Sequence, residues 1–313
     1  MLFTLERPVS TYDLNSMNRW EDLDPDPRLL AALDQADRER GQRAQLIVDG
    51  SASDKNNWSN SFADACARMI ATALRERHYK KRLSVLPDPE GSAEPPTITY
   101  WDRGEAKTKK IDVLVGDLIG GLQVAVSLKG VGFRDKHSLG FGKNITGRLY
   151  ELENETRRLH EYRPQAVVVG LYFVPIGAVQ DKKTTRSASG FADVVTSLRR
   201  LTGRADAHRQ DEWHRVDLGF VGLYVPGDSE HFVVRNSEPM EYNAISYKDP
   251  FPRGVVRYFD VREDPPVRGR PQIDRTLALE EMIDVIANVQ AGPREEQLTW
   301  SPAELDPPVR GPQ

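Results

Sequence analysis

The stretch KKIDVLVGDLIGGLQVAVSLKG, residues 109–130, decides the fold because it contains two apolar β-type runs on either side of a glycine pair. The runs IDVLVGDL and LQVAVSLK are separated at Gly120 and Gly121, and this spacing predicts an antiparallel hairpin. Asp112 stands near the start of the first run and Lys129 at the end of the second. A hairpin would therefore bring a carboxylate and an ammonium to the same edge of a sheet.

The second run also predicts which side chains share a face of that sheet. Successive side chains of a strand point to opposite faces, so residues two apart project together. One face carries Gln123, Ala125, Ser127 and Lys129, and the other carries Val124, Val126 and Leu128. The valine and leucine face predicts contact with the main core, so Ser127 and Lys129 are expected to project together from the opposite face.

Two helices are predicted around the hairpin. The segment SFADACARMIATALRERHY, residues 61–79, places its apolar side chains on one helical face, and Ser61 with Asp64 resembles a capping box at its start. The segment NITGRLYELENETRRLHEY, residues 144–162, has a second helical pattern that Pro164 ends. The hairpin is therefore expected to have one helix before it and one after it.

Two further runs predict strands next to these elements. TITYWD, residues 97–102, precedes the hairpin and is expected to form an antiparallel meander with it. The run from Ala166 to Val174 is apolar almost without alternation, which is typical of a strand covered on both faces. The order of elements predicts an α/β protein (α+β, mixed sheet), with a central mixed sheet flanked by helices.

The whole chain is expected to divide into four regions. A helix over Pro27–Arg40 and a short strand over Ala44–Gly50 are predicted in the charged N-terminal part, and apolar runs with further helical patterns continue beyond Val174. The expected regions are an N-terminal annex at 1–56, a core at 57–205, an extension of the sheet for recognition or dimerisation at 206–295, and a disordered tail at 296–313.

Composition limits the class of protein. The chain has 313 residues, 39% of them hydrophobic and 29% charged, which is typical of a globular protein with one large core. A net charge of -4 argues against a generally basic nucleic-acid coat, although a local basic face remains compatible with it. The single cysteine, Cys66, excludes an internal disulfide, and we find no signal-peptide pattern and no run of eighteen apolar residues. We therefore expect a cytoplasmic protein with no membrane partner.

The arrangement around Asp112 and Lys129 resembles the PD-(D/E)xK nuclease superfamily of restriction endonucleases. The resemblance covers residues 61–175: a helix, an Asp that opens a strand, a hairpin, a strand that ends in x-Lys, a helix and a buried strand. It implies a restriction-endonuclease-like core and hydrolysis of DNA with Mg²⁺ or Mn²⁺. Asp112 matches the metal-binding Asp, and Lys129 matches the lysine that orients or activates the attacking water. Ser127 stands where most members have a second acid.

Some restriction enzymes of this superfamily combine a Ser-x-Lys strand end with a Glu from the following helix. By this resemblance Glu155, with Glu151 next, would complete the metal site with Asp112, and the catalytic set would also include Ser127 and Lys129. Both glutamates lie beside the apolar stripe of their helix. The alternative is that they are solvated helix charges paired with Arg148 and Arg158.

Basic residues flank the predicted site on both sides along the chain. Lysine and arginine side chains in such positions bind phosphates, which sets affinity without reading sequence. The candidates for DNA contact are Lys109, Lys110, Arg134, Lys136, Lys143 and Arg148. The alternative is that these residues belong to solvated turns.

Two functions from different classes follow from these patterns. The first is a Mg²⁺-dependent endonuclease that cuts double-stranded DNA as a homodimer, in restriction or phage defence, alone or with partner subunits of a defence system. The second is a catalytically inactive nuclease-like module that binds DNA or another protein. The serine at position 127 is the main evidence for the second function.

Overall fold

The computed structural model describes residues 23–78, 83–88, 96–102, 105–117, 121–130, 132–134, 140–141, 144–179, 181, 189–227, 229–235, 242–248, 251–262 and 276–290. Side chains are described in these ranges except at 78, 100–106, 117 and 229–248. Among the described residues, no helix has the length and apolar character needed to cross a membrane.

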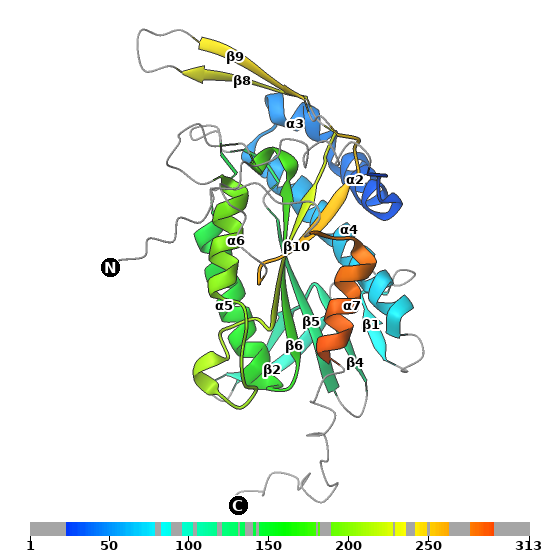
Figure 1. Cartoon of the computed structure of the whole chain (residues 1–313), viewed down its shortest axis with the longest axis vertical. Helices are drawn as coiled ribbons and strands as arrows, with labels where there is room; N and C mark the ends of the chain where they lie inside the picture. Colours follow the sequence, from blue (N-terminus) through cyan, green and yellow to red (C-terminus); the bar gives the residue numbers. More distant parts are fainter. Residues whose placement is uncertain are drawn as a thin grey trace, which may run out of the picture.

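A mixed sheet forms the centre of the molecule (Figure 1). It has seven strands, in the order β1-β4-β5-β6-β7-β10-β11. Its strands are β1 (Ser84–Leu86), β4 (Val113–Asp117), β5 (Gly121–Gly130), β6 (Val167–Pro175), β7 (Leu218–Tyr224), β10 (Val256–Asp260) and β11 (Thr276–Leu277). Strand β6 runs parallel to both β5 and β7, and the outer pairs are antiparallel. The predicted mixed sheet and the antiparallel β4–β5 hairpin are both confirmed.

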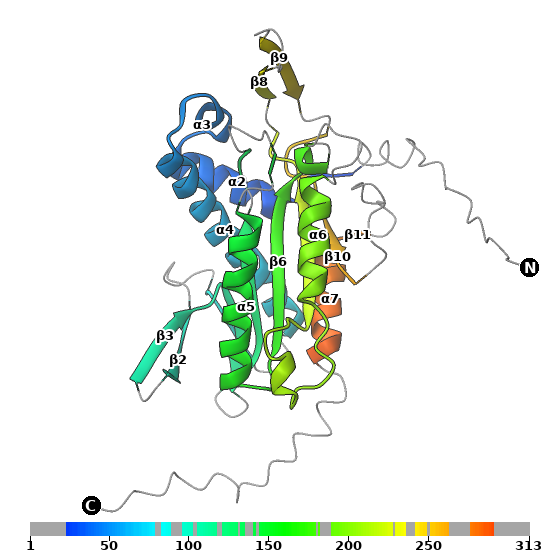
Figure 2. The ribbon, with the colours of Figure 1, turned by 90° about the vertical axis from the view of Figure 1, so that its left-hand side faces the viewer.

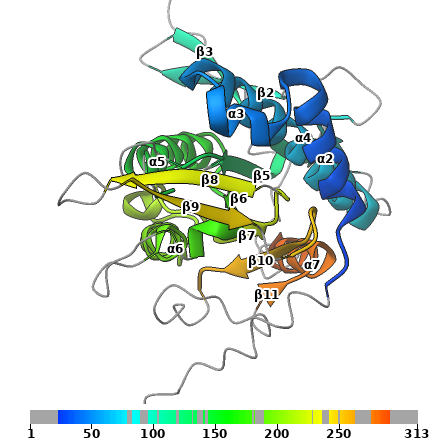
Figure 3. The ribbon, with the colours of Figure 1, turned by 90° about the horizontal axis from the view of Figure 1, so that it is seen from above.

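Helices cover both faces of this sheet (Figures 2 and 3). One face carries α2 (Pro27–Arg40), α4 (Ala52–His78) and α7 (Leu279–Gln290), and the other carries α5 (Ile145–Tyr162) and α6 (Gly190–Arg200). The remaining helical segments are α3 (Arg43–Asp49) and the 3-10 turns η2 (Ile176–Val179) and η3 (Gln210–Glu212). The predicted helices over residues 27–40 and 144–162 are confirmed within one residue of their bounds.

Strand β6 separates the two halves of the core. All of its residues are buried, which confirms the prediction of a strand covered on both faces. Val169 and Phe173 pack in the core under α4, whereas Val168 and Tyr172 pack in the core under α5. Helices α2 and α7, from the two ends of the described chain, belong to the same core cluster as α4. Helices from both ends of the described chain therefore pack on the same face of the sheet.

Two hairpins lie outside the main sheet. Strands β2 (Thr97–Asp102) and β3 (Glu105–Lys110) pair with each other, and so do β8 (Ser229–Arg235) and β9 (Tyr242–Lys248). The predicted meander is therefore wrong, because TITYWD pairs with β3 while the short strand β1 occupies the outer edge of β4. An alternating pattern shows that a run is extended, but it does not show which strand it pairs with.

Two details near the N-terminus also differ from expectation. The segment 44–50 was predicted as a strand, but its residues 44–49 belong to α3. Helix α4 begins at Ala52, so Ser61 is inside the helix, where its hydroxyl accepts a hydrogen bond from Arg40 Nε at 3.0 Å. The capping box is instead formed by Ser51 and Asp54, since the Asp54 amide donates to Ser51 Oγ and the Ser51 amide donates to Asp54 Oδ2. The residues between Ser51 and Ser61 are mostly polar and lack the apolar spacing by which a helix is predicted, so the predicted helix began too late.

A buried polar network ties α5, β6 and β7 together. The Asp217 carboxylate, just before β7, accepts hydrogen bonds from the Val168 amide at 2.7 Å and from Arg204 Nη2 at 3.1 Å. His160 Nε2 lies 3.3 Å from the same carboxylate, and His160 Nδ1 lies 2.9 Å from the Trp213 carbonyl. The Arg204 and His160 side chains are 0% exposed, so the network fixes the C-terminal end of α5 against the sheet.

The chain that leaves β5 is held against the N-terminal helices. The Arg43 guanidinium lies 4.8 Å from the centroid of the Phe133 ring and 5.7 Å from that of Trp58, and it donates to the Gly132 carbonyl. Cation–π contacts of this kind stabilise a guanidinium that is withdrawn from water. The chain that follows β5, and with it the end of the strand where Lys129 stands, is therefore held against α3 and α4.

Candidate active site

Asp112 lies directly before β4 and is fixed by the neighbouring strand. Its Oδ2 atom accepts a hydrogen bond of 2.6 Å from the amide of Leu128, at the end of β5. The antiparallel β4–β5 register opposes Val113 to Val126, which brings the start of one strand next to the end of the other. The sequence predicted this meeting of Asp112 with the Lys129 end of β5.

Glu155 of α5 completes the group. Its Oε2 accepts a hydrogen bond of 2.7 Å from Ser127 Oγ, and Lys129 Nζ lies 2.9 Å from Oε2 and 3.1 Å from Oε1. Lys109 Nζ, from β3, lies 2.9 Å from Oε1. Ser127 and Lys129 project together toward α5, as the alternation along β5 predicts, and a single carboxylate contacts all three of these side chains.

These side chains surround one cavity of about 180 Å³. It is lined by Lys109, Lys110, Ile111, Asp112, Ser127, Lys129, Glu155 and Leu159. The carboxylates come from the start of β4 and from α5, so hairpin, sheet and helix all contribute to its walls. A polar cavity of this size has room for several water molecules or a small anion.

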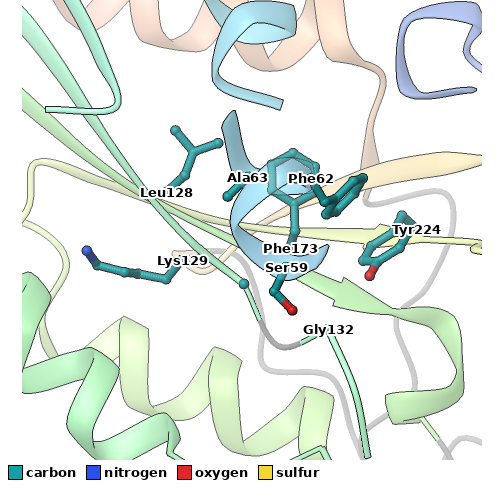
Figure 4. A pocket seen from close by; sticks show the side chains of 9 residues that line it. Ser59, Phe62, Ala63, Leu128, Lys129, Gly132, Phe173 and Tyr224 are labelled. Atoms are coloured by element: carbon teal, nitrogen blue, oxygen red, sulfur yellow. The ribbon is translucent and has the colours of Figure 1, made fainter. Parts of the chain in front are cut away.

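A much smaller cavity of about 10 Å³ lies beside Lys129, and Figure 4 shows its lining. The rings of Phe62, Phe173 and Tyr224 are part of its wall, and the ammonium of Lys129 points away from them (Figure 4). A space of this volume holds about one water molecule. Lys129 therefore borders this small aromatic cavity, while its ammonium is directed to Glu155.

The two carboxyl groups have opposite pKa shifts. Burial is the strongest influence on Asp112 and raises its pKa above the ordinary value, although the Leu128 amide and the Lys129 ammonium act to lower it. Burial also acts most strongly on Glu155, but Lys129, Lys109 and Ser127 together lower its pKa below the ordinary value. Glu155 is therefore ionised at neutral pH, and the charge of Asp112 is the more costly of the two.

The lowered pKa of Glu155 predicts a pH-dependent contribution to stability. An acid whose pKa is lower in the folded state stabilises the fold above its unfolded pKa, and this contribution is lost as the pH falls through the folded value. Glu155→Gln should cost about 1–3 kcal/mol at neutral pH, because Lys129 and Lys109 lose a charged partner. The cost should shrink as the pH falls below about 4.3, the ordinary pKa of Glu. Urea denaturation from neutral to acidic pH measures it.

Glu151→Gln is the matched control for this measurement. Glu151 is 53% exposed and pairs at 3.1 Å with Arg148, which is 44% exposed. Exposed pairs of this kind contribute about 0.2–1 kcal/mol, so the control should show a small cost. An equal cost of Glu155→Gln at neutral and at acidic pH would contradict the role of Glu155 as an ionised partner.

The structure separates the two glutamates that the sequence left as candidates. Glu155 lines the cavity, whereas Glu151 does not and instead pairs with Arg148 on the outer side of α5. Arg134 lies 4.6 Å from the centroid of the Phe141 ring and is likewise not part of the cavity wall. Lys109 and Lys110 do line the cavity. Lys136 and Lys143 lie outside the described residues.

Sequence reasoning missed two features of the site. Asp64 of α4 is close enough to raise the pKa of Asp112, and burial raises its own pKa. Its position in an S-x-x-D pattern suggested a helix cap instead. Lys109 was predicted to contact DNA, yet its ammonium lies on Glu155. No local pattern gives this pairing, since Lys109 and Glu155 are 46 residues apart.

The donor set is suitable for a hard divalent cation. The described residues contain no cluster of three or more His, Cys, Asp or Glu side chains arranged to hold a metal ion. Mg²⁺, however, is commonly bound through one or two carboxylates with water and substrate phosphate as its other ligands. Asp112 and Glu155 line the same cavity and provide those two carboxylates.

Comparison of the chain with protein-family models, curated proteins and solved structures finds no match. The site must therefore be interpreted from its own residues. They include two carboxylates that line one polar cavity at the edge of a mixed sheet. One of these carboxylates, that of Glu155, contacts a serine hydroxyl and two ammonium groups.

Proposed function

We propose that the protein is a metal-dependent endonuclease that hydrolyses phosphodiester bonds of double-stranded DNA. The observation that carries the proposal is the convergence of Asp112, Glu155 and Lys129 on one cavity of about 180 Å³. Phosphodiester hydrolysis requires groups that hold a cation, a group that stabilises negative charge near the phosphate, and space for water. The three side chains provide the protein's part of this set.

The contact of Glu155 with Ser127 supports an active site in spite of the serine at position 127. Ser127 stands where the superfamily's second acid is usually found, and its hydroxyl donates a 2.7 Å hydrogen bond to Glu155. The serine thus acts as a hydrogen-bond donor that orients a carboxylate from the adjacent helix. This arrangement favours a relocated acid over a lost one.

Each residue has a defined part in the proposed mechanism. A Mg²⁺ or Mn²⁺ ion, when bound, would offset negative charge on the phosphate and lower the pKa of a coordinated water. Asp112 and Glu155 would be its protein ligands. The Leu128 amide orients the Asp112 carboxylate by donating a hydrogen bond to Oδ2. Lys129 is 9% exposed and is held at the cavity by Glu155, where its ammonium can stabilise charge on a phosphate oxygen.

The wider setting remains part of the proposal. Lys110 is exposed at the cavity, where it can contact a phosphate, and Arg148 lies further along α5. Cutting both strands of a duplex calls for two such sites, which favours a homodimer. A role in restriction or phage defence in the cytoplasm, alone or with partner subunits, fits an enzyme of this kind.

Cleavage of plasmid DNA in Mg²⁺, Mn²⁺ or EDTA tests the proposal, with Glu155→Gln and Glu151→Gln compared side by side. Cleavage should require a divalent cation. Glu155→Gln should lower the rate by about a hundredfold, as expected for the loss of a group that holds charge at the reaction centre. Glu151→Gln should stay within about threefold of the wild type, because surface substitutions away from a site have small effects.

The outcomes separate the proposed functions. Metal-dependent cuts that disappear with Glu155 and persist without Glu151 support the nuclease and identify the relocated acid. Salt-dependent DNA binding with no cleavage under any metal would favour the inactive binding module instead. Neither cleavage nor binding would overturn both.

A further inference from the structure

The ammonium groups of the candidate site already outnumber its carboxylates, because Lys110 lines the cavity together with Lys109 and Lys129. Two carboxylates, Asp112 and Glu155, line the cavity, and two ammonium groups, those of Lys109 and Lys129, lie on Glu155 at 2.9 Å. A divalent cation that joined this set would raise its charge by two. Binding of the cation alone is therefore opposed, unless one ammonium leaves or an anion enters.

The two lysines are held in different ways. Lys129 belongs to β5 of the central sheet and is 9% exposed. It borders the small aromatic cavity shown in Figure 4. Lys109 belongs to β3, in a hairpin outside the main sheet, and is 34% exposed. Figure 2 shows this hairpin projecting from the body of the protein. Lys109 is therefore the ammonium that can leave Glu155 at lower cost.

We propose that Lys109 occupies the place of the divalent cation on Glu155, and that a phosphate of the DNA draws Lys109 away as the cation binds. This inference rests on the proposed nuclease function. Glu155 Oε1 accepts a hydrogen bond from Lys109 and becomes available to a cation once Lys109 contacts a phosphate. Lys109 thereby couples the binding of DNA to the binding of metal.

The coupling follows from a shared cost. Either ligand bound alone must break the contact between Lys109 and Glu155, whereas both ligands bound together break it once. The free energy saved appears as positive cooperativity between metal and DNA. The metal raises the affinity for DNA by the same factor by which DNA raises the affinity for the metal. The cooperativity has a second consequence: metal is retained mainly when a substrate phosphate is present.

Mn²⁺ binding in the absence of DNA, measured by electron paramagnetic resonance, tests whether Lys109 occupies the place of the cation. Lys109→Gln should bind Mn²⁺ roughly tenfold more tightly than the wild type, because a cation next to a ligand carboxylate has been removed. Lys110→Gln is the matched control: it removes the same charge from the next residue, which also lines the cavity. It should change the affinity by less than about threefold, since no direct contact with Glu155 is lost.

Binding of a short DNA duplex, measured by fluorescence anisotropy in EDTA and in Ca²⁺, tests whether Lys109 couples DNA binding to metal binding. The gain in DNA affinity on adding Ca²⁺ should be several-fold larger in the wild type and in Lys110→Gln than in Lys109→Gln. The ratio within each variant removes the general loss of DNA affinity that any lysine substitution causes.

The results distinguish failure of this inference from failure of the proposed function. Equal Mn²⁺ affinity in the wild type and Lys109→Gln, abolished in both by Asp112→Asn, would overturn the role of Lys109 and leave the metal site intact. An equal gain from Ca²⁺ in all three proteins would overturn the coupling. Absence of Asp112-dependent Mn²⁺ binding in every variant would overturn the metal site and the inference together.

Discussion

Asp112→Asn should lower the rate of DNA cleavage by about a hundred- to a thousandfold and leave the fold intact. The amide oxygen of Asn can still accept the hydrogen bond that Asp112 Oδ2 receives from Leu128. Burial already raises the pKa of Asp112, so a neutral side chain at this position costs the folded state little. The expected change in the free energy of unfolding is within about 1 kcal/mol.

Single-turnover cleavage and urea denaturation of the same preparations measure these two quantities. A stable Asp112→Asn protein that cuts DNA at the wild-type rate would place the metal site elsewhere. A protein that loses both activity and stability would show instead that Asp112 is a structural residue of the β4–β5 edge. Only the combination of lost cleavage and retained stability supports the proposed role.

Asp217→Ala should destabilise the protein by about 3–5 kcal/mol, because the substitution leaves a buried charge without its partner. The carboxylate receives hydrogen bonds from the Val168 amide and from Arg204, and His160 lies 3.3 Å away. Arg204 and His160 are 0% exposed, so water cannot replace the lost contacts without disruption of the core. The melting temperature should fall by about 10 °C.

Asp211→Ala is the control for this effect. Asp211 pairs with Arg209 at 2.7 Å, but the two side chains are 68% and 53% exposed. Water and salt screen an exposed pair, so its loss should hardly change the melting temperature. Similar melting temperatures for the two variants would mean that the buried network does not hold α5 against the sheet.

Local pattern predicted the elements that carry the site and failed for those that depend on a distant partner. The β4–β5 hairpin, helix α5 and the covered strand β6 follow from glycine placement, helical spacing and an unbroken apolar run. Strand β3, with the sequence EAKTKK, lacks an apolar pattern, and it was missed together with its pairing to TITYWD. Its stability comes from contacts made by its partner, since Ile98 of β2 is buried in the core under α5.

The choice between Glu151 and Glu155 shows the limit of helical spacing. The two residues are four apart, so they lie on similar sides of α5 and the sequence alone ranks them only weakly. The tertiary structure decides between them, because Ser127 and Lys129 meet the helix at the level of Glu155. Glu151 lies beyond the cavity and pairs with Arg148.

The sequence by itself therefore determined the hairpin, the shared face of Ser127 and Lys129, and the edge at which Asp112 stands. These properties depend on the two-residue period of a strand and on a short connection, which are local. Only the tertiary structure decided that Glu155 completes the group and that Lys109 lies on it. Those contacts depend on how a helix and a separate hairpin pack against the sheet, and packing is a property of the whole chain.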